Sequence, residues 1–246
     1  MVGNDWSDFY HDGLAEKVPS ENGAGGAGGK KEPPAHRYPE TAFCVEKITE
    51  ALLFLAIASA VIVVLNGLTA FPELTKKLFI TVLGLILFGA SAASIYGYIN
   101  ILIGLNRGKN EFKGYLFALG AVAVYIADLV MRIVLQIDGG ILSQIFDLIP
   151  IAVMFLTVSA TITVCGAIGH EELAEFGRRT RRIWLITAVV RVVLTVGMIA
   201  VKASAGGESA DWLDNVTAVL AALASTIGFF ILYRFFKRTD DVFKDE

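Results

Sequence analysis

The chain has 246 residues, 55% of them hydrophobic, and a mean hydropathy of +0.62. This composition excludes an ordinary soluble domain and indicates a membrane protein, because a soluble domain needs a far larger polar share to cover its surface. The formal net charge of −3 and the lack of a basic face with interleaved aromatic residues give no indication of nucleic acid as a partner.

The first 40 residues are predicted to form a disordered cytoplasmic tail. A Gly/Ala-rich linker, Gly23–Gly29, divides this tail, and two prolines follow it. Between Asp5 and Asp12 the tail is acidic and aromatic. This patch is either a docking motif for a cytoplasmic partner or part of an ordinary solvated tail.

Residues 41–238 are predicted to form a transmembrane domain of six helices. A helix needs about 20 mostly apolar residues to cross a hydrocarbon core of about 30 Å. Long apolar runs without alternation favour helices over the strands of a barrel. The six apolar stretches are residues 48–68, 78–105, 115–137, 141–168, 183–201 and 212–236. The second and fourth are longer than the core is thick, so they tilt or project into water.

The second stretch carries a strip of small residues at steps of four: Gly89, Ala93 and Gly97. Small residues on one helix face let two helices approach closely. The strip is therefore predicted to be a helix-packing surface.

Polar residues gather on the faces of the later stretches. A charge near the centre of a bilayer costs about 2.5–3.5 kcal/mol on the insertion scale, so such residues normally face the interior of a bundle. The predicted intramembrane network consists of Tyr125, Asp128, Arg132 and Gln136 in the third stretch, Gln144 and Asp147 in the fourth, and Arg191 and Thr195 in the fifth.

This network has two interpretations. It is either a site for substrate, ion or proton passage in the outer half of helices 3–6, or a neutral ion network that fixes helix packing. Helical rise puts Arg132 and Asp147 at similar depths, so they can meet. Asp128 can pair with Arg132 four residues later, or reach Arg191.

The connection between the fourth and fifth stretches, His170–Arg182, starts acidic and ends basic. Its acids are Glu171, Glu172 and Glu175, and its bases are Arg178, Arg179, Arg181 and Arg182. A helix is predicted here, since Glu175 and Arg179 have the favourable spacing for a helical ion pair. The bases either contact anionic lipid or a partner, or serve only as a topology signal.

The distribution of Lys and Arg predicts the orientation. Sixteen lie in the N-terminal segment, in the connections after the second and fourth stretches and in the C-terminal segment, whereas only Lys76, Lys77 and Lys202 lie on the other side. Positive charge favours the cytoplasmic side. Both termini, including a C-terminal tail of residues 239–246, are predicted to be cytoplasmic, with the protein in the cell (plasma) membrane.

Catalytic and metal-binding patterns are missing from the sequence. The only histidines, His11, His36 and His170, lie outside the apolar stretches, which argues against a haem site or a buried nucleophile–base pair. Cys44 and Cys165 lie near predicted cytoplasmic ends and are expected to be free thiols. No metal, cofactor or enzymatic activity is predicted.

The sequence therefore predicts an all-α, polytopic membrane protein with six transmembrane helices in a bundle, N-in and C-in. Its partners are the lipid bilayer and a membrane or cytoplasmic protein, and no oligomeric state follows from the pattern. The leading hypothesis is a non-enzymatic scaffold or partner-binding protein. The alternative is a small secondary transporter or channel.

Overall fold

The computed structural model describes residues 38–69, 77–135, 148–204 and 211–245. Within these ranges the chain forms helices and no strand, which confirms the all-helical prediction. The helices are α2 (Pro39–Thr69), α3 (Lys77–Gly108), α4 (Tyr115–Leu135), α6 (Ile149–Ala167), α7 (Glu171–Ser204) and α8 (Asp211–Asp245).

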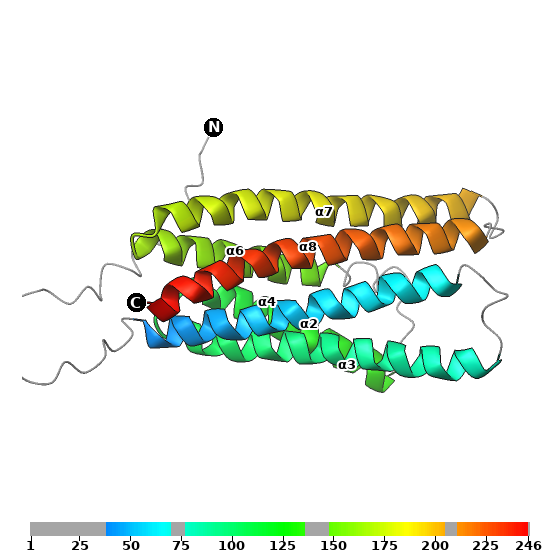
Figure 1. Ribbon diagram of the computed structural model, residues 1–246, viewed down its shortest axis with the longest axis horizontal. Coiled ribbons are helices and arrows are strands. Elements are labelled where there is room, and N and C mark those ends of the chain that lie inside the picture. The colour runs from blue at the N-terminus through cyan, green and yellow to red at the C-terminus, as the bar shows by residue number, and fades with distance from the viewer. Residues whose placement is uncertain (1–37, 70–76, 136–147, 205–210, 246) are drawn as a thin grey trace, which may run out of the picture.

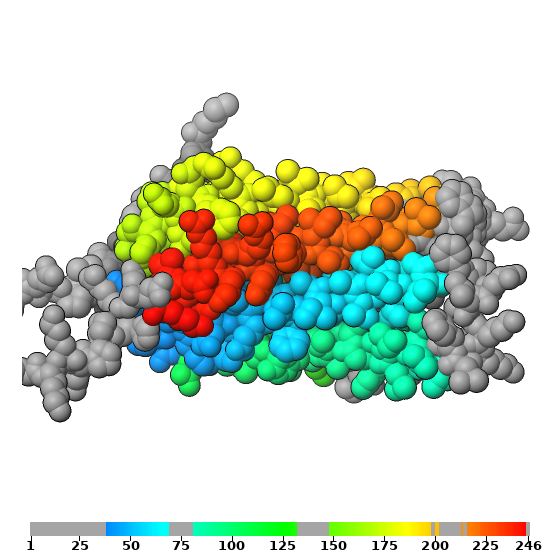
Figure 2. Space-filling view, viewed as in Figure 1, coloured from blue at the N-terminus to red at the C-terminus, as the bar shows by residue number. Residues whose placement is uncertain are grey.

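The helices alternate in direction along one long axis (Figure 1). The starts of α2, α4 and α7 and the ends of α3, α6 and α8 lie together, and we call this the basic end because Lys and Arg are concentrated there. Each helix packs against the next one along the chain, and α8 packs against α2. The six helices therefore form a closed ring, and α7, α8, α2 and α3 make up the face in Figure 2.

Within the described ranges, four helices, α2, α3, α6 and α8, are long and apolar enough to cross a membrane. The apolar part of α4 is shorter, residues Tyr115–Met131. Helix α7 begins with charged residues up to Arg182, becomes apolar from Ile183 and then carries Arg191. Several long apolar helices are what a membrane-embedded bundle requires, whereas the count of six crossings stays a prediction.

The helices reach further than the apolar stretches at the basic end. Helix α2 begins at Pro39, and α8 continues to Asp245. Thr239, Asp240 and Phe243 of α8 are buried, so this end of the chain is a packed helix. The first 37 residues, predicted to be a tail, lie outside the described residues.

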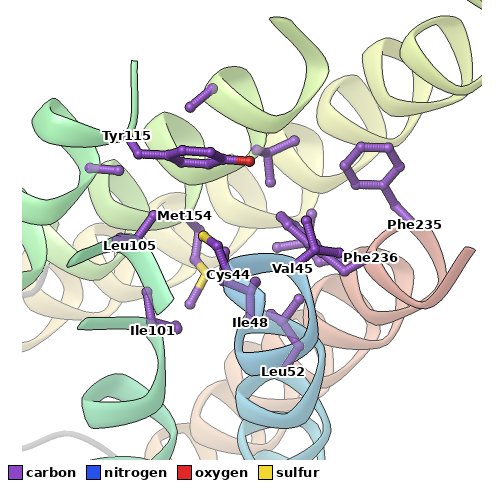
Figure 3. Close-up of a cluster of buried hydrophobic side chains, with 14 of the residues drawn as sticks. Cys44, Val45, Ile48, Leu52, Ile101, Leu105, Tyr115, Met154, Phe235 and Phe236 are labelled. Atoms are coloured by element: carbon purple, nitrogen blue, oxygen red, sulfur yellow. The ribbon is translucent and has the colours of Figure 1, made fainter. Parts of the chain in front are cut away.

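Buried side chains concentrate near the basic end (Figure 3). Side chains from five helices point toward one another there. The largest fully buried ones include Ile48 and Leu52 of α2, Ile101 and Leu105 of α3, Tyr115 of α4, Met154 of α6, and Phe235 and Phe236 of α8. Tyr115 also hydrogen-bonds to Thr161 of α6, with 3.3 Å between the two hydroxyl oxygens. This packed region, which we call the basic-end core, joins the whole ring.

The connection between α3 and α4 closes the start of α2. The Glu111 carboxylate accepts hydrogen bonds from the backbone N–H groups of Glu40 (3.1 Å) and Thr41 (2.8 Å) and from the Thr41 hydroxyl (2.6 Å). The first N–H groups of a helix have no partner within the helix, and its positive dipole end favours an anion. Glu111 therefore fixes α2 relative to the α3–α4 hairpin.

The turn between α6 and α7 uses a glycine in the left-handed region. Gly169 has φ of +92°, and the His170 N–H donates to the Cys165 carbonyl at 2.9 Å. This hydrogen-bond pattern ends a helix with an αL residue, which favours glycine. The tight turn makes α6 and α7 antiparallel neighbours.

Gly177 of α7 provides a test of the basic-end core. A Cβ at this position would lie 2.6 Å from Ile162 Cγ1 and 2.8 Å from the Phe235 ring, both in packed helices. We expect Gly177→Ala to lower the free energy of unfolding by about 1–3 kcal/mol, as overpacking does. Detergent-induced unfolding measures this. Gly197→Ala on the same helix is the control, because nothing lies within 4 Å of its Cβ, and an equal loss in both variants would contradict the packing.

Candidate functional site

Partly or fully buried polar side chains from three helices lie in the bundle, further from the basic end than most of the basic-end core. Tyr98 of α3 is 5% exposed, and its ring lies 4.4 Å, centroid to centroid, from that of Tyr125 of α4. Asp128 follows Tyr125 on the same face of α4 and is half-buried. Arg191 of α7 is half-buried and lines a pocket with residues of α6 and α8. We call Tyr98, Tyr125, Asp128 and Arg191 the interior polar cluster.

A small pocket adjoins this cluster between α6, α7 and α8. Its volume is about 30 Å³. The residues lining it include Arg191 and Thr187 of α7, Pro150 of α6 and Ser225 of α8. A space of this size holds about one water molecule.

The hydroxyls in this pocket are already engaged by their own helices. Thr187 donates to the Trp184 carbonyl at 2.7 Å, and Ser225 donates to the Ala221 carbonyl at 3.0 Å. Polar side chains that bond within their own helix fit into an apolar surrounding at little cost. Within the described residues, Arg191 is the one charged group that lines this pocket.

The structure describes only part of the predicted network. It places Tyr125, Asp128 and Arg191 in the interior. Thr195 is exposed instead, and its hydroxyl donates to the Arg191 carbonyl at 3.0 Å, so it faces away from the cluster. The side chain of Arg132 and residues Gln136, Gln144 and Asp147 lie outside the described residues.

Tyr98 is the cluster member that the sequence patterns did not single out. It lies in the second stretch, where tyrosine is compatible with an ordinary lipid-facing or interfacial position. Its spacing from Ile101 and Leu105, three and seven residues later, puts it on the buried face of α3. That periodicity is the signal that could have identified it.

The small-residue strip of α3 contacts α2 only in part. At Gly97 a Cβ would lie 3.0 Å from Leu55 Cγ, so the two helices approach closely there. Gly89 is exposed and has nothing within 4 Å of its Cβ position, and Ala93 is half-buried. The close approach continues at Gly104 and Gly108, where a Cβ would lie 3.0 Å from the Cys44 carbonyl oxygen and 2.8 Å from Cys44 Sγ. The contact strip is thus displaced toward the basic end.

A second polar contact joins α2 and α8. Thr226 Oγ1 donates to Ser59 Oγ at 3.0 Å, and Ser59 Oγ donates to the Ala222 carbonyl at 3.3 Å. Hydrogen bonds of this kind contribute to helix association where lipid offers no hydrophobic drive. They hold α8 against α2 at a level beyond the basic-end core.

Groups of three or more His, Cys, Asp or Glu side chains that could hold a metal are absent from the described ranges. Cys44 and Cys165, both buried, are free thiols. A scan against protein-family models and searches of curated proteins and of solved structures found no match for the chain.

Tyr98 allows a test of how the cluster is built. We expect Tyr98→Ala to lower the free energy of unfolding by about 3 kcal/mol, because it leaves a cavity opposite Tyr125. Tyr98→Phe should keep most of that stability if ring packing dominates. Tyr96→Ala on the same helix should cost only about 1 kcal/mol, since Tyr96 is exposed and has an edge contact with Phe54. Equal losses at Tyr96 and Tyr98 would contradict the buried position of Tyr98.

Proposed function

We propose that this chain is a six-span protein of the cell membrane with both termini in the cytoplasm, and that it acts as a non-enzymatic scaffold or partner-binding protein. The observation that carries this proposal is the interior beside Arg191, which has room for about one water molecule, about 30 Å³. Sites for small organic molecules are typically about 300–1,000 Å³. Such a nearly filled space beside Arg191 suits a charged group whose role is to fix helix packing.

The basic-end core supports the same proposal. Its helices are held together by packing and by the hydrogen bonds that the start of α2 donates to the Glu111 carboxylate. An ion pair at 4.0 Å between Lys244 of α8 and Glu46 of α2 links the last helix of the ring to the first. A rigid end of this kind can present a fixed surface to a partner at the membrane.

The topology follows from the arrangement of the charges. In the described part of the chain, the connections after α3 and after α6 and the end of α8 all lie at the basic end (Figure 1), with eleven of the Lys and Arg residues. These are Arg107, Lys109, Lys113, Arg178, Arg179, Arg181, Arg182, Arg234, Lys237, Arg238 and Lys244. The positive-inside rule assigns this end to the cytoplasm. The alternating direction of the helices supports the proposed six crossings.

A second candidate function is the passage of an ion or a proton. It is favoured by the position of Arg191, a half-buried charge facing an interior that also holds Tyr98 and Tyr125. Ionisable residues within the membrane layer often mark such pathways. A pocket that holds one water molecule is compatible with the passage of a proton.

Cysteine labelling tests the topology. Asn110 is exposed in the α3–α4 connection, whereas its neighbour Gly108 is packed against Cys44 and unsuitable. We expect a membrane-impermeant thiol reagent added to intact cells to modify Asp138→Cys but not Asn110→Cys. The unmodified parent chain is the control, since Cys44 and Cys165 are buried. Modification of Asn110→Cys from outside would invert the proposed orientation.

Substitution of the interior charges separates the two candidate functions. If the charges fix packing, Asp128→Asn and Arg191→Gln should each lower the folded yield in detergent. The double variant should recover part of that yield. The coupling between the two substitutions in the free energy of unfolding should then be about 0.5–3 kcal/mol. Proton and ion flux into vesicles should stay at the background level in all variants. Thr195→Val is the control, because its side chain faces away from the cluster. Normal yields with altered flux would refute the scaffold role and support passage.

A further inference from the structure

Three arginines of α7 form a stripe beside α6. Arg178, Arg181 and Arg182 have the spacing i, i+3 and i+4, which places them on one side of the helix. Arg181 Nη1 donates to the Ser159 hydroxyl of α6 at 3.0 Å, and the guanidinium lies 5.4 Å from the centroid of the Phe155 ring. The stripe therefore follows the outer surface of the α6–α7 pair.

The arginines of this segment differ in how far they are neutralised. Arg178 pairs with Glu171 at 2.6 Å. Arg179 pairs with Glu175, and the Arg179 guanidinium holds the pKa of that carboxyl below its ordinary value. Arg181, in contrast, contacts a neutral hydroxyl and an aromatic ring, and the structure gives Arg182 no ion pair with any described residue. Two adjacent positive charges are thus open to an external anion.

Near Arg181 and Arg182, the outer surface of both α6 and α7 changes from polar to apolar. On α7, the charged first segment ends at Arg182 and apolar residues follow, with Leu185 and Ile186 exposed. On α6, the outward-facing residues above this level are Ser159 and Thr163, and Phe155 is exposed below it. A bilayer has its phosphate layer where protein surface turns from polar to apolar.

We propose that Arg181, held in place by Ser159, and Arg182 bind the phosphate of an anionic phospholipid, and that its acyl chains lie along Phe155, Leu185 and Ile186. The guanidinium group presents donors in a planar fork that fits phosphate oxygens. Arg181 is held in place by Ser159 and Phe155 before any ligand arrives, which lowers the entropic cost of binding. The inference rests on the proposed membrane embedding, and it adds a ligand that the scaffold role does not require.

The experiment uses the purified full-length chain in mild detergent. Native mass spectrometry measures binding of dioctanoyl phosphatidylglycerol, dioctanoyl phosphatidylcholine and glycerol phosphate. We expect phosphatidylglycerol to bind more tightly than phosphatidylcholine. Arg181→Gln and Arg182→Gln should each weaken it about fivefold, corresponding to about 1 kcal/mol for each basic residue at a membrane surface. Arg181→Lys should fall between the parent and Arg181→Gln, because lysine keeps the charge and loses the fork.

Arg179→Gln is the matched control. It removes the same charge from the same helix, but Arg179 is already paired with Glu175 and lies further from the apolar part of α7 than Arg181 and Arg182 do. We expect less than a twofold effect. If Arg181→Gln folds poorly, Arg182→Gln carries the test, since Arg182 is exposed.

Three results would overturn the site. Equal weakening by Arg179→Gln would indicate unspecific attraction, equal binding of both phospholipids would remove the role of the anion, and glycerol phosphate binding as tightly as phosphatidylglycerol would indicate a free-phosphate site. Binding in detergent does not depend on orientation. A failure of the lipid site is therefore distinguishable from an inverted topology, which thiol labelling reports.

Discussion

The hydrophobic effect acts only where a helix meets water, and this constraint explains where the bundle is packed. The charged segment that begins α7, Glu171–Arg182, extends for about 18 Å before the apolar part starts. Charged residues need water, so the helices around this segment also stand in water and must bury their apolar faces there. Within the lipid layer the tails are as apolar as the side chains, so Val82–Phe88 of α3 can stay exposed.

The basic-end core in turn positions the interior polar cluster. Glu111 and the close approach of Gly104 and Gly108 to Cys44 set the register of α3 against α2. Tyr98 lies on the same helix, three turns from Gly108, and so it reaches the ring of Tyr125 at a fixed depth. The polar cluster thus depends on packing outside it. A charge such as Arg191 can be tolerated because the neighbouring helices are already held together.

The sequence predicted the positions of the helices well, because long apolar runs are a local property. It did not predict that α2 begins at Pro39, because the first turns of α2 include Glu40, Glu46 and Lys47 and resemble a solvated segment. Likewise the contacts of Gly104 and Gly108 depend on Cys44, sixty residues away. Among the polar candidates, Thr195 had helical spacing from Arg191 yet lies on an exposed side of α7, outside the interior. Pairings between helices are tertiary information that one-helix patterns do not contain.

The Lys and Arg residues also differ in whether an acidic side chain neutralises them, a difference that a count of positive charges on each side of the membrane ignores. Lys237 and Lys244 pair with Asp241 and Asp240 at 2.7 Å and 2.9 Å, so much of their field is compensated locally. Arg181 is held by neutral contacts at the level where the surface changes from polar to apolar. Compensated charges can still set orientation during insertion, when their partners have not yet formed. Charges left open after folding keep a field in the finished protein, which is what the proposed phospholipid site requires.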